Sequence, residues 1–122
     1  MPELDCEKVI RDAAALDKFL KFAQGEFSAE NLEYWIAVEE YRKAWSVAAA
    51  DTIKEDYLKE GSPKQVCIGE AKALQVINTE ASVDVFDSSQ KIALQTLKED
   101  IFPRFCDSPQ GAELAKNAAL CS

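Results

Sequence analysis

Two pairs of acidic residues are placed closely enough to support general acid–base chemistry. Asp84 lies near Asp87, and Glu39 is followed by Glu40. Neither pair sits in the apolar, pocket-like context that a catalytic carboxylate needs, and solvated charge explains both. The sequence has no histidine, which removes Ser–His and Cys–His nucleophile pairs and most zinc sites. Hydrolytic chemistry would need carboxylates alone, and we expect no catalytic residue, no metal ligand and no cofactor.

A second group of polar residues stands at the start of a strong helical pattern. Ser28, Glu30 and Asn31 follow an apolar segment that ends at Phe27. Ser28 fits an N-cap, and Phe27 before it is placed to pack on Leu32 as a hydrophobic staple. An acidic residue such as Glu30 is favoured by the helix dipole in a first turn. These residues could equally bind a partner, and both interpretations stay open at this point.

The helix that these residues open is predicted to be the central one of a bundle. Its pattern runs from Ser28 to Trp45 and includes both tryptophans. One side carries Tyr34, Ala37, Val38, Tyr41, Ala44 and Trp45. Leu32 and Ile36 open a second apolar face, so the helix needs neighbours on more than one side. We expect an all-α fold whose core contains Trp35, Tyr41, Phe86 and Phe105.

The rest of the chain reads as further helices joined by short connectors. A helix is expected over 4–24, with a restart at Asp17, and another is expected to begin at Asp51. Residues 64–68 are predicted to form an extended connector that buries Val66 and Ile68. Further helices are expected from Gly69 or Glu70 to Ile77, from a capping box at Asp87–Gln90 to a break before Pro103, and from Pro109 to Leu114.

Composition bounds the function more than it defines it. The 122 residues suit one domain, 1–122, and are 48% hydrophobic and 30% charged. A net charge of −8 argues against nucleic acid or an anionic membrane surface as the direct ligand. The sequence has neither the pattern of a signal peptide nor a run suited to membrane insertion. We expect a cytoplasmic protein whose widely spaced cysteines, Cys6, Cys67, Cys106 and Cys121, stay reduced.

Four blocks of sequence, in this order and spacing, resemble the RGS domain, the regulator of G-protein signalling module. They are F-S-A-E-N-L-E-Y-W-I-A-V-E-E-Y, Y-L-K-E-G-S-P-K-Q-V, V-F-D-S-S-Q-K-I-A-L and L-K-E-D-I-F-P-R-F-C-D-S. The first block is highly specific, and the resemblance extends from about Asp17 to Ser108. It implies a compact all-α domain of about nine helices. It also implies a surface, built from three interhelical regions, that grips the switch loops of an activated G-protein α subunit (Gα).

The resemblance assigns eight positions to Gα binding. Ser28, Glu30 and Asn31 match the first contact region of the family. Asp100 and Arg104 match the third, in which the acid meets a switch backbone and the arginine braces it. The remaining positions are Ile77, Asn78 and Thr96.

Ile77 and Thr96 are departures from the family pattern. Counting back from Val85-Phe86-Asp87, Ile77 stands where the family has an Asn or Ser near the catalytic glutamine of Gα, and Thr96 stands where it has a leucine. Asn78 is one residue away and could supply the missing amide after a small shift.

The resemblance implies a GTPase activator that performs no chemistry itself. We expect a monomer that binds Gα in its GTP-bound or transition state and accelerates GTP hydrolysis, and that its partner recruits to the inner face of the plasma membrane. The alternative is an RGS-like scaffold that binds Gα or another protein without accelerating hydrolysis.

Overall fold

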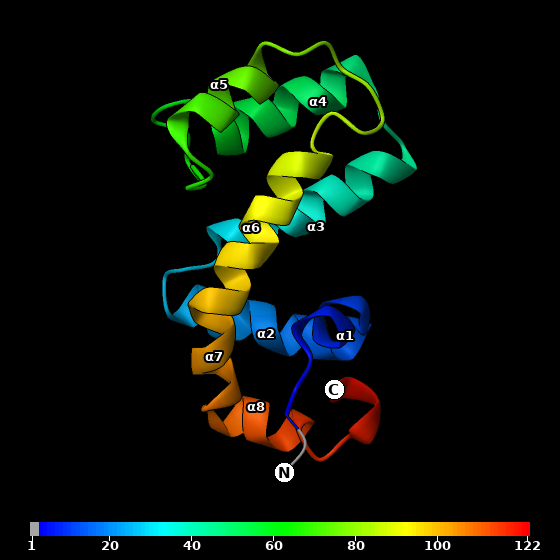
Figure 1. The fold of residues 1–122 in the computed structure, drawn as a ribbon, viewed down its shortest axis with the longest axis vertical. Helices are drawn as coiled ribbons and strands as arrows, with labels where there is room; N and C mark the ends of the chain where they lie inside the picture. Colours follow the sequence, from blue (N-terminus) through cyan, green and yellow to red (C-terminus); the bar gives the residue numbers. More distant parts are fainter. Residues whose placement is uncertain (1–2) are drawn as a thin grey trace. The chain divides into compact units, whose positions relative to one another are not determined.

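The computed structural model describes residues 3–122, which form eight α-helices, one π-helical segment and one 3₁₀ turn. Extended pairing within this range is an isolated antiparallel bridge between Leu4 and Cys121. The elements are α1 (Cys6–Arg11), α2 (Ala13–Gly25), α3 (Glu30–Lys43), α4 (Val47–Ile53), η1 (Lys54–Leu58), α5 (Glu70–Ile77), α6 (Asp87–Glu99), α7 (Ile101–Cys106), α8 (Pro109–Leu114) and η2 (Ala118–Leu120). The all-α prediction is confirmed, and Figure 1 traces the helices along the chain.

The helices belong to two compact units. The first unit comprises the described part of Met1–Ala29 together with Thr96–Ser122, and the second comprises Glu30–Gln95. In the first unit, α2 packs against α1, α7 and α8. Its core is aromatic: the ring centroid of Phe19 lies 5.6 Å from that of Phe102 and 4.9 Å from that of Phe105. Such edge and tilted contacts are the favoured geometry for aromatic pairs.

The core of the second unit gathers around α3. Tyr41 packs edge-on against Phe86 with a centroid distance of 4.9 Å, and Tyr34 lies 5.5 Å from Tyr57. The connector before α5 contributes Val66 and Ile68, which are 5% and 6% exposed, as its alternating pattern predicts. In this unit α5 packs against η1 (Figure 1).

Most of the expected core is confirmed, but the central helix is shorter than predicted. Trp35, Tyr41, Phe86 and Phe105 are all less than a tenth exposed. However, α3 ends at Lys43, and Trp45 beyond it is 46% exposed. The apolar periodicity of the sequence continues to Trp45, but the helix ends two residues before it.

Two helix starts were misplaced because more than one capping residue was available. The helix expected to restart at Asp17 begins after Asp12, whose carboxylate accepts from the backbone N–H of Ala15 at 2.9 Å. The helix expected at Asp51 begins after Ser46, whose hydroxyl accepts from the N–H of Ala49 at 3.0 Å. Both observed caps are standard N-caps, placed earlier than predicted.

The C-terminal helices follow the proline pattern. α6 ends at Glu99 before Pro103, which lies inside the short α7. Pro109 opens α8, where Ser108 accepts from the N–H of Gly111 at 3.1 Å. No helix among residues 3–122 combines the length and the apolar character needed to cross a bilayer.

Candidate functional site

The segment between α2 and α3 holds an exposed aromatic residue in a strained backbone conformation. The N–H of Ser28 donates to the carbonyl of Ala23 at 2.9 Å and that of Phe27 donates to Gln24 at 3.1 Å, which is the Schellman pattern at the end of α2. The left-handed position of this motif is normally glycine, but here it is Phe27, with φ 54°. Its side chain is 90% exposed, so the predicted staple onto the buried Leu32 is wrong.

Ser28 is not the N-cap of α3. The helix begins at Glu30, which places Ala29 at the capping position, one residue later than predicted. The Ser28 hydroxyl instead donates to the carbonyl of Glu26 at 3.3 Å, and the residue is partly exposed. Its hydroxyl therefore lies on the turn that presents Phe27.

Glu30 and Asn31 form the first turn of α3, in the second unit. Glu30 is partly exposed at the positive end of the helix dipole, as predicted. The side-chain oxygen Oδ1 of Asn31 is buried and makes no hydrogen bond within the described residues. Buried polar atoms are nearly always paired, so an orphaned amide oxygen in a predicted contact region points to a function.

The acidic and basic residues of the third predicted region meet in the first unit. The guanidinium of Arg104 lies 3.5 Å from Asp100 and 3.9 Å from Glu26. The side chain of Asp100 is 67% exposed, and that of Arg104 is 45% exposed. Arg104 thus links the carboxylate before α7 to the turn that carries Phe27 and Ser28. The sequence prediction missed Glu26 because its partner is distant in the chain.

The second predicted region lies at the C-terminal end of α5. Ile77 is half-buried and packs against the core of the second unit. Asn78 is the exposed C-cap, and its N–H donates to the carbonyl of Leu74 at 3.0 Å. Of these two neighbours, only Asn78 has a side-chain amide, and it is the exposed one. A cavity of about 370 Å³ lies beside Ile77, and its wall includes the exposed Cys67.

The eight predicted contact residues divide evenly between the units. Ser28, Thr96, Asp100 and Arg104 belong to the first, and Glu30, Asn31, Ile77 and Asn78 belong to the second. Thr96 is half-buried on α6. Phe27 was not among the predicted contacts, because its left-handed backbone and its exposed ring are visible only in the structure.

Comparison with known proteins decides the family. The model of the regulator of G protein signaling domain matches residues 5–111. The chain belongs to this family. Regulator of G-protein signaling 16 of Rattus norvegicus is 36% identical over 110 residues, covering 85% of this chain and 55% of the relative. Regulator of G-protein signaling 5 of Bos taurus is 36% identical over 116 residues, which cover 90% and 64% of the two chains.

A third relative is regulator of G-protein signaling 21 of Homo sapiens, 30% identical over 108 residues, covering 84% of this chain and 71% of the relative. The chain thus spans little more than half the length of the regulator 16 proteins that it matches. All eight predicted contact positions lie within the matched residues 5–111.

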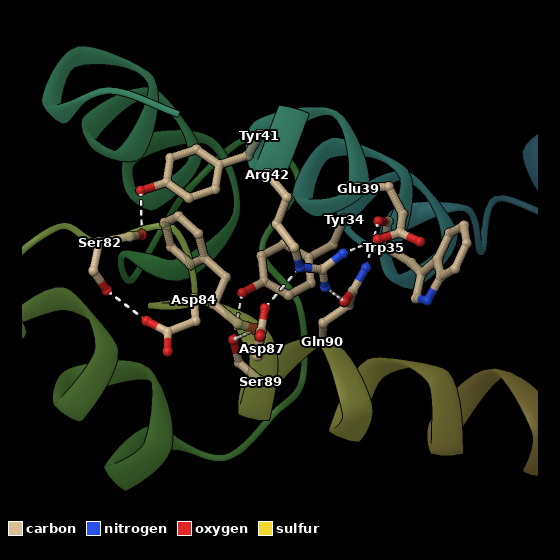
Figure 2. A network of polar contacts seen from close by, with 11 residues as sticks. Tyr34, Trp35, Glu39, Tyr41, Arg42, Ser82, Asp84, Asp87, Ser89 and Gln90 are labelled. Atoms are coloured by element: carbon tan, nitrogen blue, oxygen red, sulfur yellow. Dashed lines mark hydrogen bonds and ion pairs between the residues drawn. The ribbon is translucent and has the colours of Figure 1, made fainter. Parts of the chain in front are cut away.

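A polar network in the second unit of this RGS domain fixes α3 against the start of α6 (Figure 2). Arg42 donates to Asp87 at 2.8 Å and also to Glu39 and to the side-chain oxygen of Gln90. The Gln90 amide donates in turn to the carbonyl of Trp35 at 2.9 Å. Gln90 therefore bridges two helices and does not close the predicted capping box. The planar, five-donor fork of an arginine suits such a junction.

Two tyrosines of α3 extend this network (Figure 2). The hydroxyls of Tyr34 and Ser89 lie 2.6 Å apart, and Ser89 also lies 2.9 Å from the carbonyl of Phe86. Burial raises the pKa of Tyr34 to about 12, opposed by the hydrogen bond with Ser89. Tyr41 donates to the carbonyl of Ser82 at 2.7 Å. The RGS domain thus holds the helix that carries Glu30 and Asn31 by several directional contacts.

Proposed function

We propose that this RGS domain binds the switch regions of an activated Gα subunit and accelerates GTP hydrolysis. The whole chain, 1–122, acts as one functional domain in this proposal, since the family match runs through both units. We propose a monomer that acts in the cytoplasm and that Gα brings to the inner face of the plasma membrane. The domain contributes no catalytic residue of its own.

The observation that carries the proposal is the buried oxygen of Asn31 at the start of α3, which has no hydrogen-bond partner among the residues that the structure describes. Leaving such an acceptor without a donor costs about 1–3 kcal/mol in the free domain. A backbone or side-chain N–H from a partner would remove this cost on binding. Asn31 also lies in the motif that carries the family resemblance, where a Gα contact is expected.

The third region supports the same partner. The exposed Asp100 carboxylate has the acceptor capacity to take backbone N–H groups from a switch loop. Arg104, 3.5 Å away, limits the directions in which this carboxylate can point. A carboxylate held by an arginine is better suited to a fixed backbone than a freely rotating one, because less rotamer entropy is lost on binding.

Positioning alone is sufficient for the proposed activity. In Gα proteins an arginine in cis stabilises the transition-state charge, and a glutamine orients the attacking water. A partner that rigidifies the switch loops favours the transition state over the more mobile ground state and so lowers the barrier. The directional network around Arg42 supports this proposal, because a clamp must be stiffer than the loops that it holds.

The alternative, a scaffold without activating capacity, is favoured by one specific observation. Ile77 presents an aliphatic side chain that packs against the core, so the amide expected near the catalytic glutamine is absent at this position. Asn78 is exposed and can supply it. Loss of activity in Asn78→Ala assigns the amide to Asn78, whereas faster hydrolysis with Ile77→Asn assigns the position to Ile77. If neither variant changes the rate of GTP hydrolysis, the second contact region is removed from the proposal.

The deciding experiment measures binding to Gα in its GDP-bound, GTP-like and transition-state-mimicking forms, together with single-turnover hydrolysis of GTP by Gα. Tightest binding to the transition-state mimic and faster hydrolysis are expected. Asp100→Ala should remove stimulation, and the matched control Asp107→Ala, an exposed acid at the end of α7, should retain it. Equal binding to the GTP-like and transition-state forms, without faster hydrolysis, would establish the scaffold instead.

A further inference from the structure

Lys54 is a buried lysine whose ammonium group closes the C-terminal end of α5. The residue is only 8% exposed. Its Nζ donates to the carbonyl of Ile77 at 3.2 Å and to the carbonyl of Thr79 at 3.0 Å. The last carbonyls of a helix have no intrahelical partner, so a cation placed there satisfies them and complements the helix dipole.

Lys54 is the first residue of the π-helical segment η1, directly after α4. The defining hydrogen bond of η1 runs from the N–H of Lys59 to the carbonyl of Lys54 at 3.0 Å. Within the segment, Tyr57 and Leu58 are buried in the core of the second unit, while Lys54 reaches α5. A π turn inserts one extra residue, which rotates the side chains after it relative to an α-helix. The side chains of η1 therefore contact both the core of the second unit and the end of α5.

The surroundings of the ammonium make its hydrogen bonds necessary. Lys54 and Ile77 line a cavity of about 310 Å³ together with Asp51, Glu55 and Lys59. Glu55 pairs with Lys59, and both side chains are largely exposed. A buried ammonium is costly unless acceptors surround it, so the carbonyls of Ile77 and Thr79 bind Lys54 as much as it binds them. The contact fixes the turn between these carbonyls.

We infer that Lys54 is a positioning residue that holds the turn of residues 77–79, and with it the exposed amide of Asn78, ready for Gα. The inference rests on the proposed function, because Asn78 is the candidate amide of the second contact region. Lys54 acts from within the core and touches Gα nowhere in this proposal. Its effect reaches the partner through the backbone of the turn.

The test compares three variants by amide hydrogen exchange and by single-turnover hydrolysis of GTP by Gα. Lys54→Met removes the ammonium but keeps most of the length of the side chain, and Lys54→Arg keeps a charged donor. Lys59→Met is the matched control, since it removes an exposed lysine of the same region. The probes are the amides of Asn78 and Thr79, which donate to the carbonyls of Leu74 and Val76.

In Lys54→Met, both probe amides should exchange about tenfold faster or more, while the amides of α7 stay protected. The maximal rate of stimulated hydrolysis should fall several-fold, with a smaller change in the half-saturating concentration. Lys54→Arg should restore both readouts toward the wild type, and Lys59→Met should resemble the wild type. A folded Lys54→Met with wild-type exchange at both amides, or with a wild-type maximal rate, overturns the inference.

Three further outcomes are informative. If Lys54→Met does not fold, the ammonium of the wild type is observed directly by NMR at low temperature. A slowly exchanging signal coupled to the Ile77 or Thr79 carbonyl supports the inference, and a rapidly exchanging ammonium refutes it. If the wild-type domain does not stimulate Gα, the proposed function fails. If the wild type and Lys54→Met stimulate equally, only the inference about Lys54 fails.

Discussion

Replacing Asn31 by leucine should stabilise the free domain while it weakens Gα binding. Within residues 3–122 the buried side-chain oxygen of Asn31 has no hydrogen-bond partner, which costs about 1–3 kcal/mol. Leucine branches at Cγ as asparagine does, removes this oxygen and has a higher helix propensity than asparagine. Some of the gain is lost because the amide nitrogen of Asn31 is removed as well. We expect a net increase of about 1 kcal/mol in the free energy of unfolding.

Thermal or urea unfolding followed by circular dichroism measures this change. For a domain of 122 residues, 1 kcal/mol corresponds to an increase of about 4 °C in Tm. The same variant should lose one hydrogen bond with Gα and leave an N–H of the partner unpaired, which weakens binding by about tenfold or more. Glu40→Gln is the control, because Glu40 is exposed on the same helix and should change neither quantity.

The two measurements refute different steps of the reasoning. A destabilisation of more than about 1 kcal/mol in Asn31→Leu would mean that the asparagine oxygen has a partner in the free domain. Higher stability with unchanged binding would mean that the oxygen is unpaired for a reason unrelated to Gα. Only increased or equal stability together with weakened binding supports both steps.

Three other predictions follow from the described contacts. Tyr34→Phe and Ser89→Ala should each destabilise the domain by about 1–2 kcal/mol. Together they should destabilise it by less than the sum, because the double variant leaves no buried hydroxyl unpaired. A double-mutant cycle in urea measures this difference, and additive effects would contradict the prediction. Phe27→Gly should raise stability by about 0.5–1 kcal/mol in urea unfolding, because it removes the strain of a left-handed backbone. It should also weaken Gα binding, because an exposed ring is lost. Destabilisation by this variant would show that the ring packs against the free domain. Burial raises the pKa of Cys6 from 9.0 to about 12, so its contribution to stability is complete below pH 9 and is lost as pH rises toward 12. Cys6→Ala should therefore flatten the decline of stability at alkaline pH. An unchanged slope in pH-dependent unfolding would refute the assignment of this decline to Cys6.

The parts of the fold that could be predicted are those that local patterns determine. The connector at 64–68 alternates buried Val66, exposed Cys67 and buried Ile68, which is the period of two that its sequence predicts. The helix starts were harder because Ser46 and Asp51 are both good capping residues. The earlier start prevailed, and with it Ala50 and Ile53 are buried in the core. Local propensity did not distinguish the two caps, but packing did.

Contacts between distant residues could not be predicted from local patterns. Gln90 fits a capping box in the sequence, yet its side chain bonds to Arg42 and to the carbonyl of Trp35, which are 48 and 55 residues away. Lys54 is similar, since its acceptors lie 23 and 25 residues along the chain. A pattern of charged and polar residues does not indicate which of them will be buried together. These contacts support the proposed contact regions, and no local pattern in the sequence indicates them.

The two clearest failures of local prediction lie within one short segment. At Phe27 the sequence predicted a staple, yet the structure has an exposed ring on a left-handed backbone. At Asn31 the structure has a buried oxygen that no described residue hydrogen-bonds. Each feature lowers the stability of the free domain. A partner that donated to the oxygen would remove the cost at Asn31, and one that covered the ring of Phe27 would bury its apolar surface. A hydrogen bond from a partner to Asn31 would therefore add to the free-energy difference between the free and the bound states. That concentration in residues 27–31 is the physical reason to place the first Gα contact there.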